Sequence, residues 1–178
     1  MIKKIEKEFE NLSITAMLIA ILTATVITKS TFEFYVVPTG SMLPTLSIGE
    51  FQLGKIIRSE TDLHRGDIVT FNTERGMVFV KRLIGMPGDT IEINDGVLYL
   101  NGAAQVEEYL MDDPFPMPDY GPYTVPEGHY FMMGDNRNNS GDSRVIGSIP
   151  YDALRSRVIF HCPTVLPKLL GFLRKTDY

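Results

Sequence analysis

The strongest constraint that this sequence places on its own fold is a run of 18 residues without a charged side chain, Asn11 to Thr28. A helix of that length rises about 27 Å at about 1.5 Å per residue, close to the roughly 30 Å of hydrocarbon in a bilayer. Four threonines and one serine make the segment moderately apolar. We predict one transmembrane helix over residues 11–29, with a cleaved signal peptide or an interfacial helix as the alternatives.

The charges beside this segment predict its orientation. Lys3, Lys4 and Lys7 precede it, and only Lys29 stands near its far end. Because basic residues flanking a span stay on the cytoplasmic side, we expect residues 1–10 in the cytoplasm and the rest of the chain outside. No small-x-small cleavage pattern follows, so the segment is expected to be retained. The predicted location is the cell membrane, with the lipid bilayer as a partner.

Length and charge limit what the remainder can be. A chain of 178 residues has room for one domain with a core besides the anchor. Its hydrophobic fraction of 44% and charged fraction of 22% are typical of globular proteins rather than disordered ones. The net charge is -5 and no cluster of lysine and arginine follows residue 30, which argues against nucleic acid as a partner.

Short segments with strand character, separated by glycine and proline, fill residues 30–162. We expect strands at Phe51–Gly54, Asp67–Phe71, Met77–Ile84 and His129–Met133. The clearest hairpin joins Thr90–Ile93 to Val97–Leu100, because Asp95-Gly96 can supply the positive φ angles of a tight turn. The pattern predicts an all-β domain.

Two stretches are predicted to lie outside the strands. Residues 107–126 carry five acidic and five proline residues without a basic one, which favours an exposed irregular loop. Residues 163–178 place leucines beside basic residues in the pattern of a short amphipathic helix. It is too short to span a bilayer, and it either lies on the membrane or caps the β-domain.

Ser41 is a candidate nucleophile. Pro38 and Pro44 restrict the backbone on either side, Gly40 lets a substrate chain approach, and Thr39 offers a second hydroxyl two residues away. A serine nucleophile needs such an exposed turn, a base and donors for the oxyanion. Taken alone, the segment indicates only an ordinary loop.

Lys81 is a candidate base. Met77, Phe79 and Leu83 occupy the alternate positions on its side of the expected strand, with Arg82 facing the other way. An amine buried among apolar neighbours has a lowered pKa and can accept a proton near neutral pH. The alternative is an edge lysine whose stem packs while its amine reaches water.

A polar segment near the end of the domain, residues 134–144, is dense in turn-forming and hydrogen-bonding side chains. Alone it indicates only a polar loop. Calcium binding is weakly supported, because Asp135 and Asp142 lack the alternating ligand spacing of an EF-hand.

Four segments in order resemble bacterial type I signal peptidases: Gly40–Leu46 just after the span, Arg65–Val69, Val80–Asp89 and Gly134–Arg144. The resemblance covers roughly residues 30–160. It implies a catalytic core of coiled antiparallel β-sheets, with Ser41 as nucleophile and Lys81 as general base. The implied activity is removal of N-terminal signal peptides from exported preproteins, after small residues in a small-x-small pattern.

The same resemblance assigns the neighbouring groups. Thr39 and the Ser41 backbone N–H would stabilise the oxyanion, with threonine where many members have serine, and Ser140 would orient the Lys81 amine. No metal or organic cofactor is implied. A supporting polar network is implied for Asp135, Arg137, Asp142 and Arg144.

Two other functions remain open at this point. A related Ser–Lys peptidase of the self-cleaving or organelle type would use the same two residues. A membrane-tethered β-domain that only binds peptides would explain the anchor and the strands, but it would leave the serine, lysine and Asp-Asn-Arg segments without a role.

Overall fold

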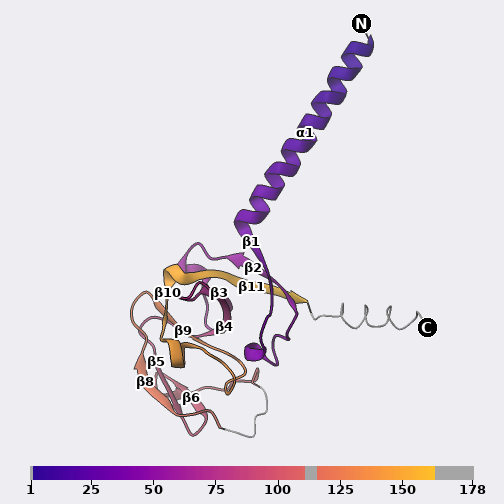
Figure 1. Ribbon diagram of the computed structural model, residues 1–178. Coiled ribbons are helices and arrows are strands. Elements are labelled where there is room, and N and C mark those ends of the chain that lie inside the picture. The colour runs from indigo at the N-terminus through magenta and orange to yellow at the C-terminus, as the bar shows by residue number, and fades with distance from the viewer. Residues whose placement is uncertain (1, 111–115, 163–178) are drawn as a thin grey trace, which may run out of the picture.

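An N-terminal helix leads into a β-domain of two antiparallel sheets (Figure 1). The computed structural model describes residues 2–110 and 116–162. Helix α1 (Ile2–Thr31) contains the predicted span and extends beyond it at both ends. Its apolar window, Ile14–Thr31, is not buried against the rest of the protein. The amphipathic segment predicted over 163–178 lies outside the described residues.

The larger sheet has the order β1-β2-β11-β3-β4-β9-β10 and the smaller one the order β7-β6-β5-β8. The larger sheet consists of β1 (Phe32–Val36), β2 (Phe51–Ile56), β3 (Ile68–Asn72), β4 (Val78–Gly85), β9 (His129–Met133), β10 (Ile149–Pro150) and β11 (Leu154–Cys162). The smaller sheet consists of β5 (Thr90–Asn94), β6 (Val97–Leu100), β7 (Ala103–Ala104) and β8 (Tyr120–Thr124). Short helical turns lie at η1 (Gly40–Met42), η2 (Glu60–Asp62), α2 (Ser143–Ile146) and η3 (Tyr151–Ala153).

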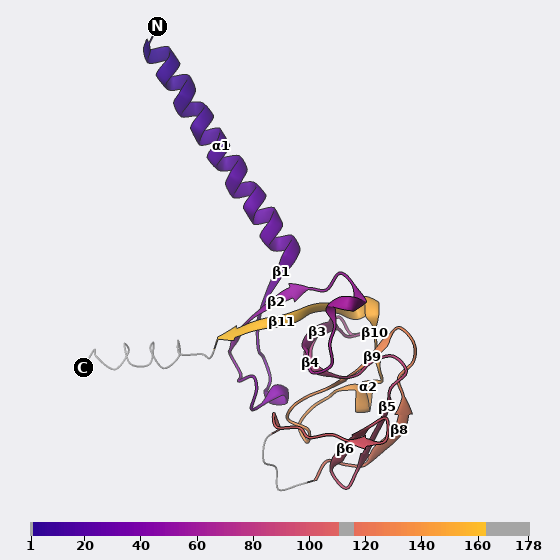
Figure 2. The same ribbon diagram turned by 180° about the vertical axis from the view of Figure 1, so that it is seen from behind.

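The predicted β class and the predicted strands are confirmed. The hairpin of β5 and β6 pairs Asn94 with Val97, so that only Asp95 and Gly96 form the turn. Their φ angles of 48° and 76° are the positive values that a two-residue turn of this kind requires. The smaller sheet lies at the end of the domain away from α1 in both views (Figure 2).

The prediction of an exposed irregular loop over residues 107–126 is wrong in part. Tyr120–Thr124 forms β8 and pairs with β5, and Met117 and Val125 are buried beside it. Glu107 is also nearly buried, with only 6% of its side chain exposed. Prolines and carboxylates predict irregular backbone locally, but here pairing with β5 and an arginine partner for Glu107 overcome that preference.

A small apolar cluster holds the turn that carries Ser41. Val37, Met42 and Leu46 are buried together, and Ile68 of β3 and Val80 of β4 pack against them. Two residues of the Ser41 segment therefore point into the protein as anchors. This packing places η1 over β4, the strand that carries Lys81.

Candidate active site

Strand β4 buries the Lys81 amine. Lys81 lies opposite Val69 of β3, with Leu83 buried two residues further along, and only 4% of the lysine is exposed. No carboxylate in the described part of the chain forms an ion pair with it. Burial lowers the pKa of Lys81 to about 8, although the carboxylates of Asp142 and Asp135 act in the opposite direction. A substantial fraction of the amine is therefore neutral near physiological pH.

The structure brings Ser41 and Lys81 together. Ser41 lies in η1, which begins at Gly40 directly after the extended residue Thr39, and Lys81 Nζ lies 2.7 Å from Ser41 Oγ. The same amine donates to the Val80 carbonyl at 3.0 Å and stands 5.2 Å from the centre of the Phe79 ring. These contacts fix the end of a long side chain at the serine hydroxyl.

Thr39 contributes a second hydroxyl at the same place. Its Oγ1 lies 3.4 Å from Ser41 Oγ. Thr39 is exposed, whereas Ser41 is 8% exposed, so the two hydroxyls stand at the boundary between the protein and solvent. A peptide carbonyl placed there would meet Ser41 Oγ and the Thr39 hydroxyl together.

Asp135 links the Ser41 segment to β4. Its carboxylate accepts two hydrogen bonds from Arg82, from Nε at 2.8 Å and from Nη2 at 2.6 Å. It also accepts one from the Thr45 hydroxyl at 2.5 Å. Arg82 directly follows Lys81, so the residue next to the buried lysine is tied through Asp135 to the segment that carries Ser41.

Asp142 and Arg144 form a second buried pair. Arg144 donates to Asp142 from Nε at 2.9 Å and from Nη2 at 2.8 Å, and the backbone N–H of Gly134 donates to the same carboxylate at 3.0 Å. Burial alone would raise the pKa of Asp142, but the hydrogen bonds from Arg144 and Gly134 hold it below its ordinary value. Asp142 therefore stays ionised and orders the polar segment.

The hydrogen bond expected between Ser140 and Lys81 is not formed in this structure. Ser140 Oγ is buried and forms no hydrogen bond of good geometry, although it lies near enough to the Asp142 carboxylate to help lower the pKa of that group. It nevertheless lies close to the site, because a Cβ built on Gly134 would come within 2.3 Å of Ser140 Oγ and 2.5 Å of the Ser41 carbonyl oxygen.

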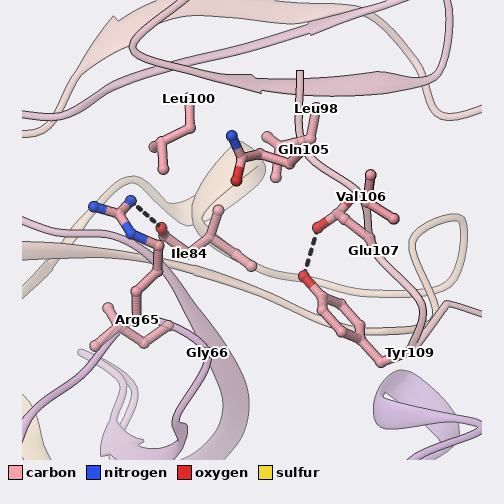
Figure 3. Close-up of a pocket in the computed structure, with 10 residues that line it drawn as sticks. Arg65, Gly66, Ile84, Leu98, Leu100, Gln105, Val106, Glu107 and Tyr109 are labelled. Atoms are coloured by element: carbon pink, nitrogen blue, oxygen red, sulfur yellow. Dashed lines mark hydrogen bonds between the residues drawn. The ribbon is translucent and has the colours of Figure 1, made fainter. Parts of the chain in front are cut away.

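A separate cavity of about 200 Å³ lies between the two sheets (Figure 3). Neither Ser41 nor Lys81 lines it. Leu83, Ile84, Leu98, Leu100 and Val106 give it an apolar surface, and Arg65, Gln105, Glu107 and Tyr109 add polar groups.

Tyr109 connects that cavity to the side of the domain that holds Ser41 and Lys81. Its ring lies 3.9 Å from the Arg82 guanidinium, and its hydroxyl donates to Glu107 at 2.5 Å. Glu107 in turn accepts two hydrogen bonds from Arg137, at 2.5 and 2.7 Å. The partner of Arg137 is therefore Glu107, a residue for which the sequence pattern predicts an exposed loop.

Sequence reasoning missed several residues of this arrangement. Arg82 was expected only to face away from Lys81, and Thr45 and Asn136 were not singled out. Asn136 donates its side-chain amide to the Gly40 carbonyl and its backbone N–H to the Ser41 carbonyl, both at 3.1 Å. A polar side chain in an irregular segment carries no periodic signal, so only the pairing across the fold reveals these roles. No group of three or more metal-ligating side chains gathers in residues 2–110 and 116–162.

Comparisons with known proteins agree with this architecture. The family model described as signal peptidase, peptidase S26, matches residues 11–162. Signal peptidase I T of Bacillus subtilis (strain 168) is 44% identical over 139 residues, which cover 72% of each chain. A signal peptidase I of Bacillus licheniformis is 43% identical over 141 residues, covering 74% of this chain and 76% of the relative.

A solved structure shows the same fold. The crystal structure of a signal peptidase I from Enterococcus faecalis V583 superposes with a TM-score of 0.50 at 35% identity, covering 57% of this chain and 97% of the other. The fold and the relatives define a serine peptidase. The chain belongs to the signal peptidase family, peptidase S26.

Proposed function

We propose that Ser41 is the nucleophile and Lys81 the general base of a signal peptidase that cuts preproteins at the membrane. The observation that carries this assignment is the 2.7 Å contact between the Ser41 hydroxyl and a buried amine whose pKa is lowered to about 8. A neutral amine accepts the hydroxyl proton, whereas an ordinary lysine would be protonated and unable to do so.

The reaction proceeds through an acyl-enzyme. Lys81 accepts the proton of Ser41 as its Oγ attacks the scissile carbonyl, and the oxyanion receives hydrogen bonds from the Thr39 hydroxyl and the Ser41 N–H. The protonated Lys81 gives its proton to the leaving amine. Water, deprotonated by the same lysine, then attacks the ester and releases the signal peptide. The separation of 3.4 Å between the hydroxyls of Thr39 and Ser41 supports placing the oxyanion beside both.

The other polar residues of the site act as supports. Asp135 holds the Ser41 segment through Thr45 and Arg82, and Asp142 with Arg144 orders the segment that contains Ser140. Ser140 is proposed to bond the amine once Lys81 changes protonation or substrate binds. Its buried hydroxyl near the Ser41 carbonyl supports that role.

The proposed substrates are preproteins cut after small residues at alternate positions. The relatives' name, signal peptidase I, supports this substrate class. An extended peptide beside β4 would point alternate side chains toward the same surface, which is how a small-x-small preference can arise.

The bilayer is the second proposed partner, with residues 1–10 cytoplasmic, 11–29 spanning and 30–162 outside. Residues 163–178 would form the amphipathic C-terminal segment.

An exposed apolar face next to α1 supports the bilayer as partner: Phe34 of β1 and Phe160 of β11 both lie opposite Leu53 of β2, and they are 69% and 59% exposed. Val36 and Phe51 continue this face and are also exposed. Such a surface is more stable against lipid than against water.

Cleavage of a purified preprotein by the detergent-solubilised enzyme tests the chemistry. Ser41→Ala and Lys81→Ala should each abolish cleavage while thermal unfolding stays cooperative. Activity retained by either variant would remove that residue from the reaction. A domain that only binds peptides would hold the preprotein without cutting it, in the parent and in both variants alike.

Thr39→Val tests the oxyanion assignment, because valine keeps the shape of the side chain and removes its hydroxyl. We expect kcat to fall about 100-fold to 1,000-fold with little change in KM, since the lost hydrogen bond forms only in the transition state. An unchanged kcat would exclude Thr39 as a donor.

The exposed thiol of Cys162, the single cysteine, tests the orientation. A membrane-impermeant maleimide should label it in intact spheroplasts. Labelling that requires permeabilised membranes would place residues 30–162 in the cytoplasm and reverse the proposed topology.

A further inference from the structure

Asn136 makes two hydrogen bonds to the backbone on either side of Ser41. Its side-chain Nδ2 donates to the Gly40 carbonyl oxygen, and its backbone N–H donates to the Ser41 carbonyl oxygen, each at 3.1 Å. Asn136 is only 9% exposed. One residue therefore holds, through two hydrogen bonds, the two peptide units that meet at the Cα atom of the nucleophile.

These two hydrogen bonds directly restrict the backbone geometry of Ser41. A peptide unit is planar, and in the trans form its N–H points opposite to its C=O. Holding the Gly40 carbonyl thus fixes the direction of the Ser41 N–H, which belongs to the same unit. Holding the Ser41 carbonyl fixes the next unit, and the two planes together set the direction of the Ser41 Cα–Cβ bond, from which the hydroxyl projects toward Lys81 Nζ at 2.7 Å.

We propose that Asn136 is a positioning residue that aims both the Ser41 hydroxyl and the Ser41 N–H at the scissile carbonyl. This inference rests on the proposed nucleophilic role of Ser41. Asn136 itself touches neither substrate nor the reacting atoms, so its contribution passes entirely through the backbone of η1.

The surroundings of Asn136 keep these two hydrogen bonds in place. Asp135, its neighbour in the chain, is held by Arg82 and Thr45. The Asn139 N–H donates to the Asn136 carbonyl at 3.0 Å. Gly134 allows this close approach, because a Cβ at that position would lie 2.5 Å from the Ser41 carbonyl oxygen. The polar segment is therefore fastened independently of the contact between Lys81 and Ser41.

Two substitutions separate the side-chain bond from the backbone bond. Asn136→Ala removes the donor to Gly40. Asn136→Asp keeps the size and replaces the donor by a carboxylate oxygen, which repels the Gly40 carbonyl. Both keep the backbone N–H that bonds Ser41. Asn139→Ala is the matched control, because Asn139 is exposed in the same segment and its backbone bond survives the change.

Preprotein cleavage by the full-length enzyme in detergent gives the first readout. We expect kcat to fall about 10-fold to 100-fold in both Asn136 variants, since a misaimed oxyanion donor loses part of its effect. In Asn136→Ala, KM, the pH midpoint set by Lys81 and the unfolding temperature should stay close to those of Asn139→Ala, whereas the carboxylate added in Asn136→Asp should move the midpoint to higher pH. Unchanged kcat in both variants would overturn the proposal.

A peptide aldehyde gives the second readout. It adds to Ser41 as a hemiacetal: the Ser41 Oγ bonds to the carbonyl carbon and the proton passes to the carbonyl oxygen, which then occupies the oxyanion position. Affinity for the aldehyde should fall in proportion to kcat/KM, while affinity for the matching uncleavable peptide stays constant. Equal loss for both ligands with a lower unfolding temperature would show a merely structural role and contradict the proposal.

Ser41→Ala, measured alongside, keeps the two hypotheses apart. If Ser41→Ala is inactive and the Asn136 variants have full activity, positioning by Asn136 is wrong and the nucleophile assignment stands. If Ser41→Ala cleaves the preprotein, the nucleophile assignment fails and the positioning role fails with it.

Discussion

Lys81 and Arg82 are adjacent on β4 and face opposite sides of the strand, and their surroundings have opposite effects on their protonation. Lys81 is buried with a serine hydroxyl, a carbonyl and an aromatic ring as neighbours, and its pKa falls to about 8. Arg82 is held by the buried carboxylate of Asp135 through two hydrogen bonds, and that pairing keeps it charged despite its burial. One side of the strand holds a group that can exchange a proton, and the other holds a group that cannot.

The difference shows that the site keeps the titratable amine of Lys81 apart from the ion pairs that stabilise its structure. A carboxylate bonded to Lys81 would raise its pKa and remove the base, so the carboxylates must stand far enough away to avoid pairing. The same carboxylate paired with arginine gives a strong, permanently charged link. Asp135 therefore contributes structure on the Arg82 side without greatly stabilising the ammonium form of Lys81.

Lys81→Arg should cause the largest loss of activity. It makes both sides alike, because arginine does not lose its proton in proteins. We expect preprotein cleavage to fall by about 10⁴-fold or more, as for removal of a catalytic base elsewhere. Rates from purified enzyme measure this, with the unfolding temperature as the control for folding. Substantial activity in Lys81→Arg would exclude proton acceptance by this residue.

Arg82→Met removes the partner of a fully buried carboxylate on the supporting side. Breaking such a pair from one side costs about 3–5 kcal/mol, so we expect a loss of that order in the free energy of unfolding. Denaturant titration measures it. The double variant with Asp135→Asn should recover much of the loss, because no buried charge is then left unpaired. A single variant as stable as the parent would show that the pair holds nothing in place.

The pH dependence of cleavage tests the Lys81 side. Since only the neutral amine accepts the serine proton, kcat/KM should rise about tenfold per pH unit up to about pH 8 and then level off. Asp142→Asn should move the midpoint to lower pH, because the Asp142 carboxylate raises the pKa of Lys81. A midpoint that moves upward in this variant would contradict the electrostatic assignment.

Lys81→Met should produce the smallest effect, a gain in stability. The folded pKa of Lys81, about 8, lies below its ordinary value of 10.5. Below pH 8 both states are protonated and the buried ammonium destabilises the fold. Above pH 8 the amine is neutral in the folded state, and above pH 10.5 it is neutral in the unfolded state as well. The destabilisation by the buried ammonium therefore declines between these two pH values and is absent above pH 10.5. The free energy of unfolding of Lys81→Met should exceed that of the parent by about 1–2 kcal/mol at pH 7, allowing for partial relaxation of the site. This difference in stability should shrink above pH 8.

Local signals predicted much of the fold. Asp95-Gly96 predicted one hairpin. Apolar residues at alternate positions of the strand predicted burial of Lys81 as one of two alternatives. The pairing of β2 with β11 joins residues about a hundred positions apart, for which no local pattern exists. Strand β8 was missed because its proline and its glycine oppose strand formation until β5 provides a partner.

The site was predicted unevenly for the same physical reason. Ser41 and Lys81 were identified through ordered motifs, and the structure places them in contact. Asn136 and Thr45 depend on bonds between distant segments, so their residue types alone gave no indication. Ser140 remains a prediction, because its buried hydroxyl lies near the site without reaching Lys81.

Helix α1 passes into β1 with no residue between Thr31 and Phe32, and Arg58 donates to the Ser30 carbonyl at 2.7 Å, which fastens the end of the helix to the domain. An enzyme held in this way by a membrane anchor meets its substrates by lateral diffusion. Its turnover in a cell should then follow the number of preproteins per unit area of membrane rather than their concentration in solution.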